Sequence, residues 1–144
     1  MEQYAIRQLS IFMENNKGEL SEISTVLSNE KINIKSLLLV DSTDFGILRL
    51  IVEDTDKAIQ ILVDSGYTVK VNQVFAVKAA DKIGSFSQVV KILSQQDINI
   101  LYTYAFSEDQ FAVFIFKVEK GDFDNAVEAL KKSDIELFDN SFII

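Results

Sequence analysis

Two short polar loops carry the residues whose types and spacing best suit ligand binding. Asn15 stands three positions before Gly18, and Asp81 stands three positions before Gly84, with a shift of 66 positions between the two loops. Each glycine precedes a segment with helical periodicity, and the first N–H groups of a helix lack internal partners and attract anions. The amide or carboxylate three positions earlier offers oxygen atoms to a cation. Both loops therefore combine groups for a small ligand that carries both charges.

A purely structural role is also open for each of these residues. Gly18 and Gly84 suit a tight turn that leads into a helix, and Asp81 suits a helix start near the positive end of the dipole. The two loops differ chemically, because Asn15 can donate and accept hydrogen bonds whereas the Asp81 carboxylate only accepts them. If both loops bind a ligand, we expect them to bind it with unequal strength.

The composition removes several kinds of chemistry. The chain has neither histidine nor cysteine, which excludes catalytic triads, thiol nucleophiles, disulfides and zinc sites built on those side chains. Its acidic residues do not follow the spacing of a calcium-binding loop. Catalysis by carboxylate, lysine or tyrosine stays open, but nothing in the sequence brings such groups together. We therefore expect no enzymatic activity, no metal and no cofactor.

Charge and hydropathy bear on partners and location. A net charge of −8 disfavours binding to nucleic acid or to anionic lipid. The longest uninterrupted apolar run, residues 111–116, is far shorter than the roughly 20 residues of a membrane-spanning helix. The first residues lack the basic and apolar pattern of a secretory signal. The sequence therefore predicts a cytoplasmic protein without a membrane segment.

The apolar spacing predicts alternating strands and helices in the first half of the chain. Leu20, Ile23 and Leu27 recur at helical spacing and predict a buried stripe on one helix. Asp54 to Asp56 is typical of a helix start, and Gly66 is typical of a helix end. In order, the predicted elements are a strand at 4–13, a helix at 19–30, a strand at 33–41, a turn at 42–46, a strand at 47–53, a helix from 54 to 65 and a strand at 67–71.

The same order recurs in the second half. A shift of 66 positions aligns Leu20, Ile23 and Leu27 with Phe86, Val89 and Leu93, and after Gly121 the shift becomes 68 because of a two-residue insertion. Two units of the order β-α-β-β-α-β are typical of the ferredoxin-like fold. We predict an α+β protein with two tandem ferredoxin-like βαββαβ units, each an antiparallel sheet with its helices on one face. The predicted domains are 1–72 and 73–144.

Strand parity indicates which residues face the helices. Leu9, Ile11 and Met13, and their repeat partners Phe75, Val77 and Ala79, fall beneath the helices, as do Leu48, Leu50 and Val52 with Phe114, Phe116 and Val118. The opposite faces are also apolar at Ile47, Ile51, Val113 and Ile115. Two helices cover only one face of a sheet, so these residues indicate a further contact, most simply a homodimer. Tyr102, Tyr104 and Phe106 form an aromatic stripe that suits such a contact or a ligand pocket.

At this point the chain resembles the ACT domain family of small regulatory modules that bind amino acids. The resemblance covers nearly the whole chain as two tandem copies. It rests on the element order, on the two loops with Asn or Asp three positions before Gly, and on the Asn-Ile pairs Asn33-Ile34 and Asn99-Ile100 that open the second strand of each copy. Loops of this family usually carry proline before the glycine, whereas here Lys17 and Ile83 stand there.

The resemblance implies a ligand site at a seam between two units. One site would combine the loop of residues 15–18 with Asn99, and the other would combine the loop of residues 81–84 with Asn33. For both asparagines a turn between helix and strand is the alternative role. The implied ligand-binding residues are Asn15, Lys17, Gly18, Glu19, Leu20, Asn33, Ile34, Asp81, Ile83, Gly84, Ser85, Phe86, Asn99 and Ile100.

The resemblance also implies a function. We expect a stand-alone regulatory sensor that binds a free amino acid, forms a homodimer and passes its state to an enzyme or regulator on another chain. The alternative is a non-catalytic module for oligomerisation or protein interaction, in which the loops are only turns. The sequence leaves the identity of the amino acid open.

Overall fold

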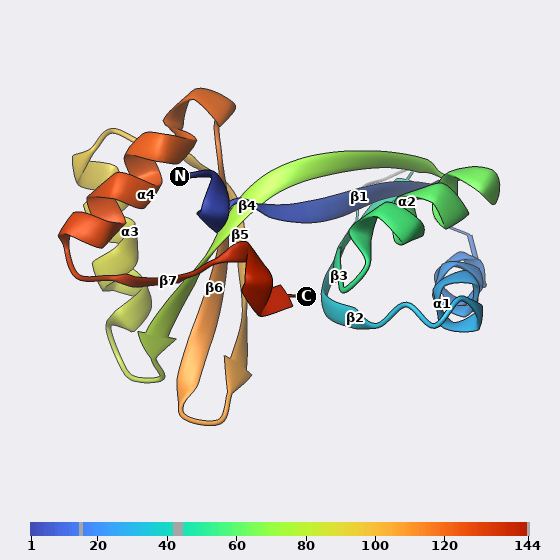
Figure 1. The fold of residues 1–144 in the computed structure, drawn as a ribbon, viewed down its shortest axis with the longest axis horizontal. Coiled ribbons are helices and arrows are strands. Elements are labelled where there is room, and N and C mark those ends of the chain that lie inside the picture. Colours follow the sequence, from blue (N-terminus) through green and yellow to red (C-terminus); the bar gives the residue numbers. More distant parts are fainter. Residues whose placement is uncertain (15, 42–44, 144) are drawn as a thin grey trace. The chain divides into compact units, whose positions relative to one another are not determined.

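The computed structural model describes residues 1–14, 16–41 and 45–143, and these residues fall into two compact units. The N-terminal unit comprises Arg7–Asn72 together with Ile143, and the C-terminal unit comprises Met1–Ile6 together with Gln73–Phe142. Each unit has its own helices and strands (Figure 1). The elements of the N-terminal unit are β1 (Ile6–Glu14), α1 (Glu19–Asn29), β2 (Ile34–Asp41), β3 (Phe45–Val52), α2 (Thr55–Asp64) and the first part of β4 (Thr68–Ala80).

The C-terminal unit repeats this order with the shifts that the sequence predicts. Helix α3 follows α1 by 66 positions, and α4 follows α2 by 68 positions, with the 3-10 helix η2 at the site of the predicted insertion. The remaining elements of this unit are the second part of β4, α3 (Ser85–Gln95), β5 (Ile100–Glu108), β6 (Phe111–Val118), η2 (Lys120–Asp122), α4 (Phe123–Lys132), β7 (Glu136–Phe138) and η3 (Asn140–Ile143), and η1 (Glu2–Tyr4) precedes β1.

The strand pairing is that of two ferredoxin-like units. In the N-terminal unit the strand order is β2-β3-β1-β4, and in the C-terminal unit β6 lies between β5 and β4 while β7 pairs with β4 on its other side. The strand pairs β1–β3, β2–β3, β4–β6, β4–β7 and β5–β6 are antiparallel. The predicted α+β class and the tandem ferredoxin-like arrangement are therefore confirmed.

All four helices end with the same hydrogen-bond pattern. The residue after each C-cap has positive φ, and these residues are Lys31, Gly66, Asp97 and Asp134. In each case the next residue donates its N–H to the carbonyl five positions earlier, as from Ile32 to Leu27 and from Tyr67 to Leu62. This is the Schellman motif, which satisfies carbonyl groups that a helix end leaves free. The predicted helix end at Gly66 is confirmed.

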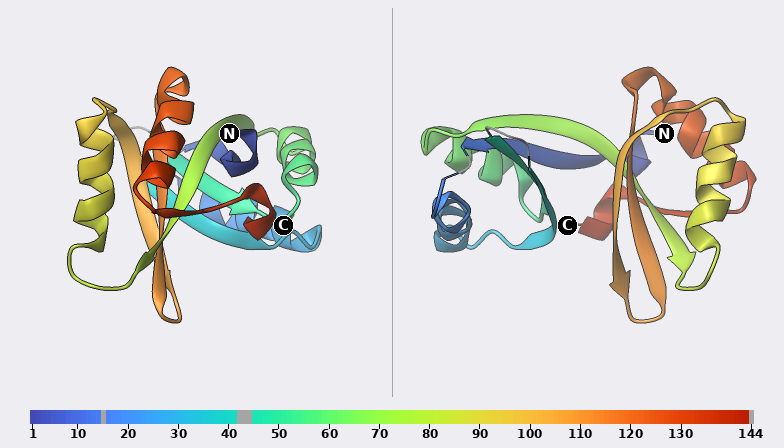
Figure 2. Two further views of the ribbon diagram at one scale, coloured as in Figure 1. Left: turned by 60° about the vertical axis from the view of Figure 1, so that its left-hand side comes forward. Right: turned by 180° about the vertical axis from the view of Figure 1, so that it is seen from behind.

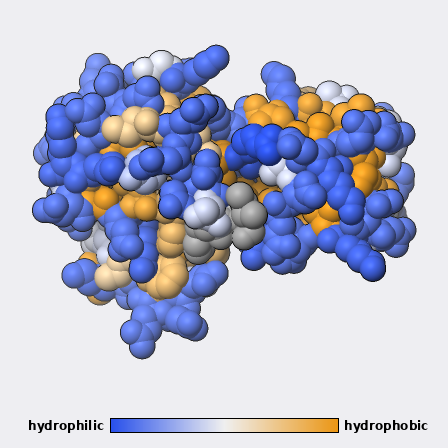
Figure 3. All heavy atoms as spheres, viewed as in Figure 1, coloured by the Kyte–Doolittle hydropathy of each residue, from blue (hydrophilic) through white to orange (hydrophobic). Residues whose placement is uncertain are grey.

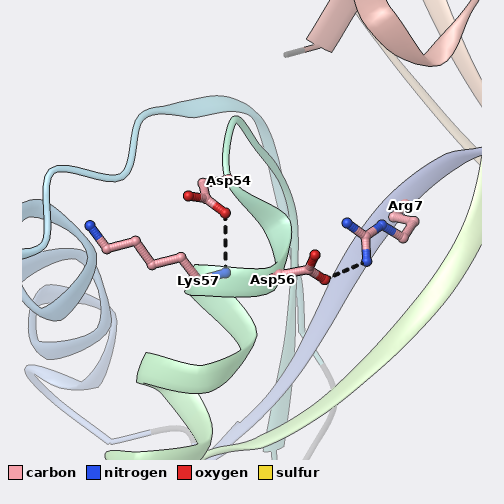
Figure 4. Close-up of polar contacts among 4 residues, drawn as sticks. All are labelled: Arg7, Asp54, Asp56 and Lys57. Carbon is pink, nitrogen blue, oxygen red and sulfur yellow. Dashed lines mark hydrogen bonds and ion pairs between the residues drawn. The ribbon is translucent and has the colours of Figure 1, made fainter.

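Side chains fix the start of α2 in the N-terminal unit (Figure 4). The Asp54 carboxylate accepts a hydrogen bond of 3.2 Å from the backbone N–H of Lys57, as an N-cap does. Asp56 forms an ion pair of 2.7 Å with Arg7 of β1. The guanidinium of Arg7 donates to the carboxylate and lowers the pKa of Asp56. The start that the sequence predicts for this helix is therefore supported by two side chains.

Each unit has its own core between its helices and one face of its sheet. The N-terminal core contains Leu9, Ile11 and Leu50 from the sheet with Ile23 and Leu62 from the helices. The C-terminal core contains Phe75 and Phe116 with Leu93 and Leu130, and its helices α3 and α4 lie on the same side of the sheet (Figure 2). The predicted parity of the strands is confirmed for these faces.

The opposite sheet faces are buried to different degrees. Ile51, Val113 and Ile115 are at most 1% exposed within the single chain, whereas Ile47 is half-buried. Their apolar character therefore does not by itself require a second copy of the chain, and the homodimer stays a prediction. Tyr102, Tyr104 and Phe106 of β5 are half-buried on this same face, because they pair with Lys117, Ile115 and Val113 of β6.

Several predicted bounds differ from the structure. The first strand begins at Ile6 and not at residue 4, because residues 2–4 form η1. The strand predicted at 67–71 begins at Thr68 and continues to Ala80. The domain division at 72–73 stays a prediction, and the two compact units divide at the same position, within this strand. Leu20 was predicted in the buried stripe of its helix but is 43% exposed. Of the predicted turn at 42–46, residues 42–44 lie outside the described residues, and Phe45 and Gly46 belong to β3.

Candidate ligand site

The described residues of the two polar loops share the same glycine conformation and the same backbone hydrogen bonds. Gly18 and Gly84 precede α1 and α3 with φ of 87° and 90°. In the first loop Asn16 donates its backbone N–H to Glu14 and Glu19 donates to Asn16, and in the second Lys82 donates to Ala80 and Ser85 to Lys82. The repeat seen in the sequence is thus a repeat of loop geometry. Asn15, the predicted ligand residue of the first loop, lies outside the described residues.

Gly18 and Gly84 are required because their φ angles are positive, and not because a larger side chain would clash with a neighbour. A Cβ atom added to Gly18 or Gly84 would meet no atom within 4 Å. Positive φ is the left-handed region that L side chains avoid. The space above each glycine is open, so a ligand can approach the backbone there.

A cavity of about 470 Å³ lies beside the second loop within the C-terminal unit. It lies between the loop and the start of α3 on one side and the last part of β5 with the start of β6 on the other. This volume falls in the range of small-molecule sites. The lining residues are Ala80, Asp81, Lys82, Gly84, Phe86, Ser87, Ala105, Phe106, Ser107, Ala112 and Phe114.

The cavity wall combines charged, polar and aromatic groups. Asp81 is exposed, and within the described residues its carboxylate makes no hydrogen bond or ion pair. Helix α3 has no side-chain cap, and in the described part of the chain no acceptor pairs with the backbone N–H groups of Phe86 and Ser87. The ring of Phe86 meets the ring of Phe114 edge to face, with 5.2 Å between their centroids. Residues that carry an acceptor, two free donors and apolar side chains therefore line one space.

Not all predicted residues of this half reach the cavity. Asp81, Gly84 and Phe86 line it. Ile83 is fully exposed at the loop tip, and Ser85 is buried with 6% of its surface exposed. Asn99 and Ile100 lie at the opposite end of β5 from the lining residues of that strand. Asn99 and Ala105 are six positions apart, which is about 20 Å along an extended chain.

The predicted residues of the N-terminal unit form two separate groups. Lys17 and Gly18 are exposed in the first loop, and Glu19 and Leu20 begin α1. Asn33 and Ile34 instead line a shallow cavity of about 400 Å³ beside the second half of α1. Its other lining residues are Ser24, Leu27, Ser28, Lys31 and Ile32.

Asn33 has a structural partner in its own unit. Its side-chain amide donates to the Glu53 carboxylate at 3.2 Å, and Lys35 forms an ion pair with the same carboxylate at 3.1 Å. The hydrogen bond from Asn33, followed by that from Lys35, lowers the pKa of Glu53. The backbone N–H of Glu53 also donates to the carbonyl of Asn33. Asn33 therefore ties the start of β2 to the end of β3.

The cavity contains residues that the sequence did not single out for binding. They are Ala80, Lys82, Ser87, Ala105, Phe106, Ser107, Ala112 and Phe114. The signal that could have found some of them is a difference between the repeats, because Ala105 stands where the first copy has Leu39 and Phe114 stands where it has Leu48. Such a difference acquires meaning only when the strand register places both positions beside the loop.

The structure also bears on metal binding and on membrane crossing. The described part of the chain contains no group of three or more acidic side chains placed to hold a metal ion. Within residues 1–14, 16–41 and 45–143, no helix combines the length and hydropathy that crossing a membrane requires.

Comparison with protein families identifies the class of this protein. A family model for the ACT domain pair matches residues 4–141. The chain therefore belongs to the ACT domain pair family, as the loops, the Asn-Ile pairs and the repeated fold predict. This is a family of regulatory domains.

Solved structures agree with this membership. The chain is similar to protein BT0572 from Bacteroides thetaiotaomicron, with 33% identity, a TM-score of 0.92, and coverage of 98% of this chain and 96% of that chain. It is also similar to the ligand-free regulatory subunit of aspartate kinase from Thermus thermophilus, with 10% identity, a TM-score of 0.66, and coverage of 90% and 92%. At that identity the second likeness shows the fold alone. Among curated proteins, none matches the sequence significantly.

Proposed function

We propose that this protein is a stand-alone cytoplasmic regulator that binds a free amino acid at the loop of residues 81–84. The observation that carries the proposal is the cavity of about 470 Å³ that joins this loop to α3 and β5. It supplies a free carboxylate, unpaired backbone donors and an apolar wall, which are the three things that an amino acid requires of its site.

Each charged group of the ligand has a matching partner in this site. The ligand carboxylate accepts hydrogen bonds from the N–H groups of Phe86 and Ser87, where the helix dipole also favours negative charge. The ligand ammonium donates to the Asp81 carboxylate, a charge-assisted hydrogen bond. The open space above Gly84 allows the ligand backbone to approach the loop closely.

A second unit completes the site in this proposal. Asn99 lies too far from loop 81–84 of its own unit to reach a ligand bound there. In this proposal the asparagine that precedes a second strand is therefore supplied by another unit. The proposed pairs are loop 81–84 with Asn33 and loop 15–18 with Asn99, in a homodimer. Because Asn33 is tied to Glu53 through its amide nitrogen, its carbonyl oxygen is the atom that accepts from a ligand ammonium.

In this proposal the protein has no enzymatic activity of its own. Ligand binding changes the population of the state that a partner recognises. Any regulated activity therefore belongs to an enzyme or a regulator on another chain.

A thermal-shift screen of the intact protein with each of the twenty amino acids tests the proposal. A ligand at 100 times its dissociation constant adds about 2.7 kcal/mol of stability, which is about 5–10 °C in a domain of this size. We expect one amino acid or a small chemical group of them to give such a shift. If none does at millimolar concentration, the protein is an interaction module whose loops are only turns.

The variant Asp81→Asn tests the role of the second loop. Loss of the charged acceptor weakens binding of the amino acid found in the screen by about tenfold or more, since hydrogen bonds to charged groups contribute about 1.5–3 kcal/mol. Isothermal titration calorimetry measures the dissociation constant. Asp124→Asn is the matched control, because it removes the same charge from the exposed first turn of α4. Equal binding by Asp81→Asn and the control would remove Asp81 from the site.

A further inference from the structure

The two units differ at the positions around the cavity. In the C-terminal unit the wall of the cavity includes Ala105 and Ala112. A shift of 66 positions aligns these residues with Leu39 and Gly46 of the N-terminal unit. The strand register is the same in both copies, since Leu39 and Gly46 flank the β2–β3 turn as Ala105 and Ala112 flank the β5–β6 turn. The first copy thus carries leucine at position 39, whereas the second copy carries alanine at the equivalent position 105.

In the N-terminal unit, the side chain of Leu39 occupies the space beside Gly46. A Cβ atom added to Gly46 would stand 3.5 Å from the Cδ1 atom of Leu39, which is van der Waals contact. Leu39 therefore lies over Gly46. In the C-terminal unit the side chain of Ala105 ends at its Cβ atom, so it cannot extend over Ala112 as Leu39 extends over Gly46. The cavity lies there.

The α3 side of the cavity carries the aromatic ring of Phe86, which faces the sheet wall made by β5 and β6. Phe86 stands at the first turn of α3 and is 42% exposed, although it packs edge to face on Phe114 and parallel to the ring of Phe116 at 6.0 Å between centroids. Apolar side chains also reach the surface elsewhere on both units (Figure 3). Phe86 is distinguished from them because its exposed ring borders the cavity that also contains Asp81.

We infer that the amino acid bound in the C-terminal unit has an uncharged, apolar side chain, which packs against the ring of Phe86 on the α3 side and against Ala105, Ala112 and Phe114 on the sheet side. This inference rests on the proposed function. The Asp81 carboxylate and the N–H groups of Phe86 and Ser87 hold the ligand backbone at the loop. The side chain then points along β5, where the wall contains Ala105 and Phe106 and ends at Ser107.

The closest competing ligand is an acidic amino acid. Lys82 lines the same cavity and could pair with a second carboxylate. Such a ligand would place its charge beside two phenylalanine rings, and removing a charge from water without full pairing is unfavourable. An apolar side chain instead removes the exposed surface of Phe86 from water, which is favourable.

Calorimetric titration of the intact protein with five amino acids tests the inference. The probes are leucine, phenylalanine, asparagine, aspartate and lysine. Leucine or phenylalanine should bind at least tenfold more tightly than each of the other three. Tighter binding of asparagine, aspartate or lysine would overturn the inference and leave the proposed function intact. If no amino acid binds in this series or in the thermal-shift screen, both the inference and the proposed function are wrong.

The variant Ala105→Leu tests the location of the side chain. The fold accepts leucine at this position, because Leu39 occupies it in the other unit. Filling the cavity should weaken binding of leucine or phenylalanine at least tenfold. Ser94→Leu is the matched control, since it adds a leucine at an exposed position near the end of α3 that does not line the cavity, and it should bind within threefold of the original protein. Equal binding by Ala105→Leu and Ser94→Leu would place the side chain elsewhere and overturn the inference.

Discussion

At the scale of single residues, Tyr67 is a buried polar group that works against stability. Its ring packs on the N-terminal core, and within the described residues its buried hydroxyl has no hydrogen-bond partner. A buried hydroxyl without a partner costs about 1–3 kcal/mol. We expect Tyr67→Phe to raise the free energy of unfolding by about 1 kcal/mol, measured by urea denaturation. A loss of stability would show that the hydroxyl has a partner.

The same residue gives the protein an alkaline pH dependence. Burial, with a smaller contribution from the nearby Glu22 carboxylate, raises the pKa of Tyr67 to about 12 from the ordinary value of 10.0. The folded state therefore holds this proton more tightly than the unfolded state does. Because the unfolded state loses this proton first, the free energy of unfolding falls as the pH rises from 10 to 12, relative to its value below pH 10. Tyr67→Phe should lose less stability than the original protein over this interval.

Single residues also mark what the sequence could and could not predict about the site. The loop glycines were predictable, because a repeated glycine before a helix signals positive φ. The partner of Asn33 was not, because Glu53 lies 20 positions away and reaches it only through the pairing of β2 with β3. The role predicted for Asn15 stays a prediction, since this residue lies outside the described residues.

At the scale of elements, the helix ends offer a sharp test of the fold. Asp134 follows α4 with φ of 59°, where its counterpart after α2 is Gly66. Left-handed angles cost an L residue about 1 kcal/mol relative to glycine. Asp134→Gly should therefore raise the free energy of unfolding by about 0.5–1 kcal/mol in urea denaturation. Gly66→Ala, the reciprocal change, should lower it by a similar amount, and an opposite sign for either variant would contradict the assigned helix ends.

Most elements were predictable because their hydrophobic periods are distinct. The repeat doubles each signal, so α1 and α3 begin at the residues that follow Gly18 and Gly84, as the loops indicate. The repeat did not predict the length of β4, because it marks residues 72–74 as the place where the second copy begins. These residues contain neither glycine nor proline and so carry no signal for a turn. The strand continues through them.

At the scale of the whole molecule, the cavity is the feature that sequence reasoning missed. It requires side chains from the loop of residues 80–84, from the start of α3 and from two strands. Alanine at 105 and 112 is uninformative until the register places both residues beside the loop. The sequence singled out Asp81 and Gly84, and both line this cavity. The strand residues of its wall became visible only in three dimensions.

A two-dimensional ¹H–¹⁵N NMR titration of the intact protein with leucine tests the central claim most directly. The amide signals of Gly84, Phe86 and Ser87 are predicted to shift most, together with those of Ala105 and Ser107, and to saturate with one common dissociation constant. Amides of the last turn of α4 serve as an internal reference and should not move. Saturable shifts confined to residues outside the loop, α3 and β5, or no shifts with any amino acid, would contradict the claim that this cavity binds a free amino acid.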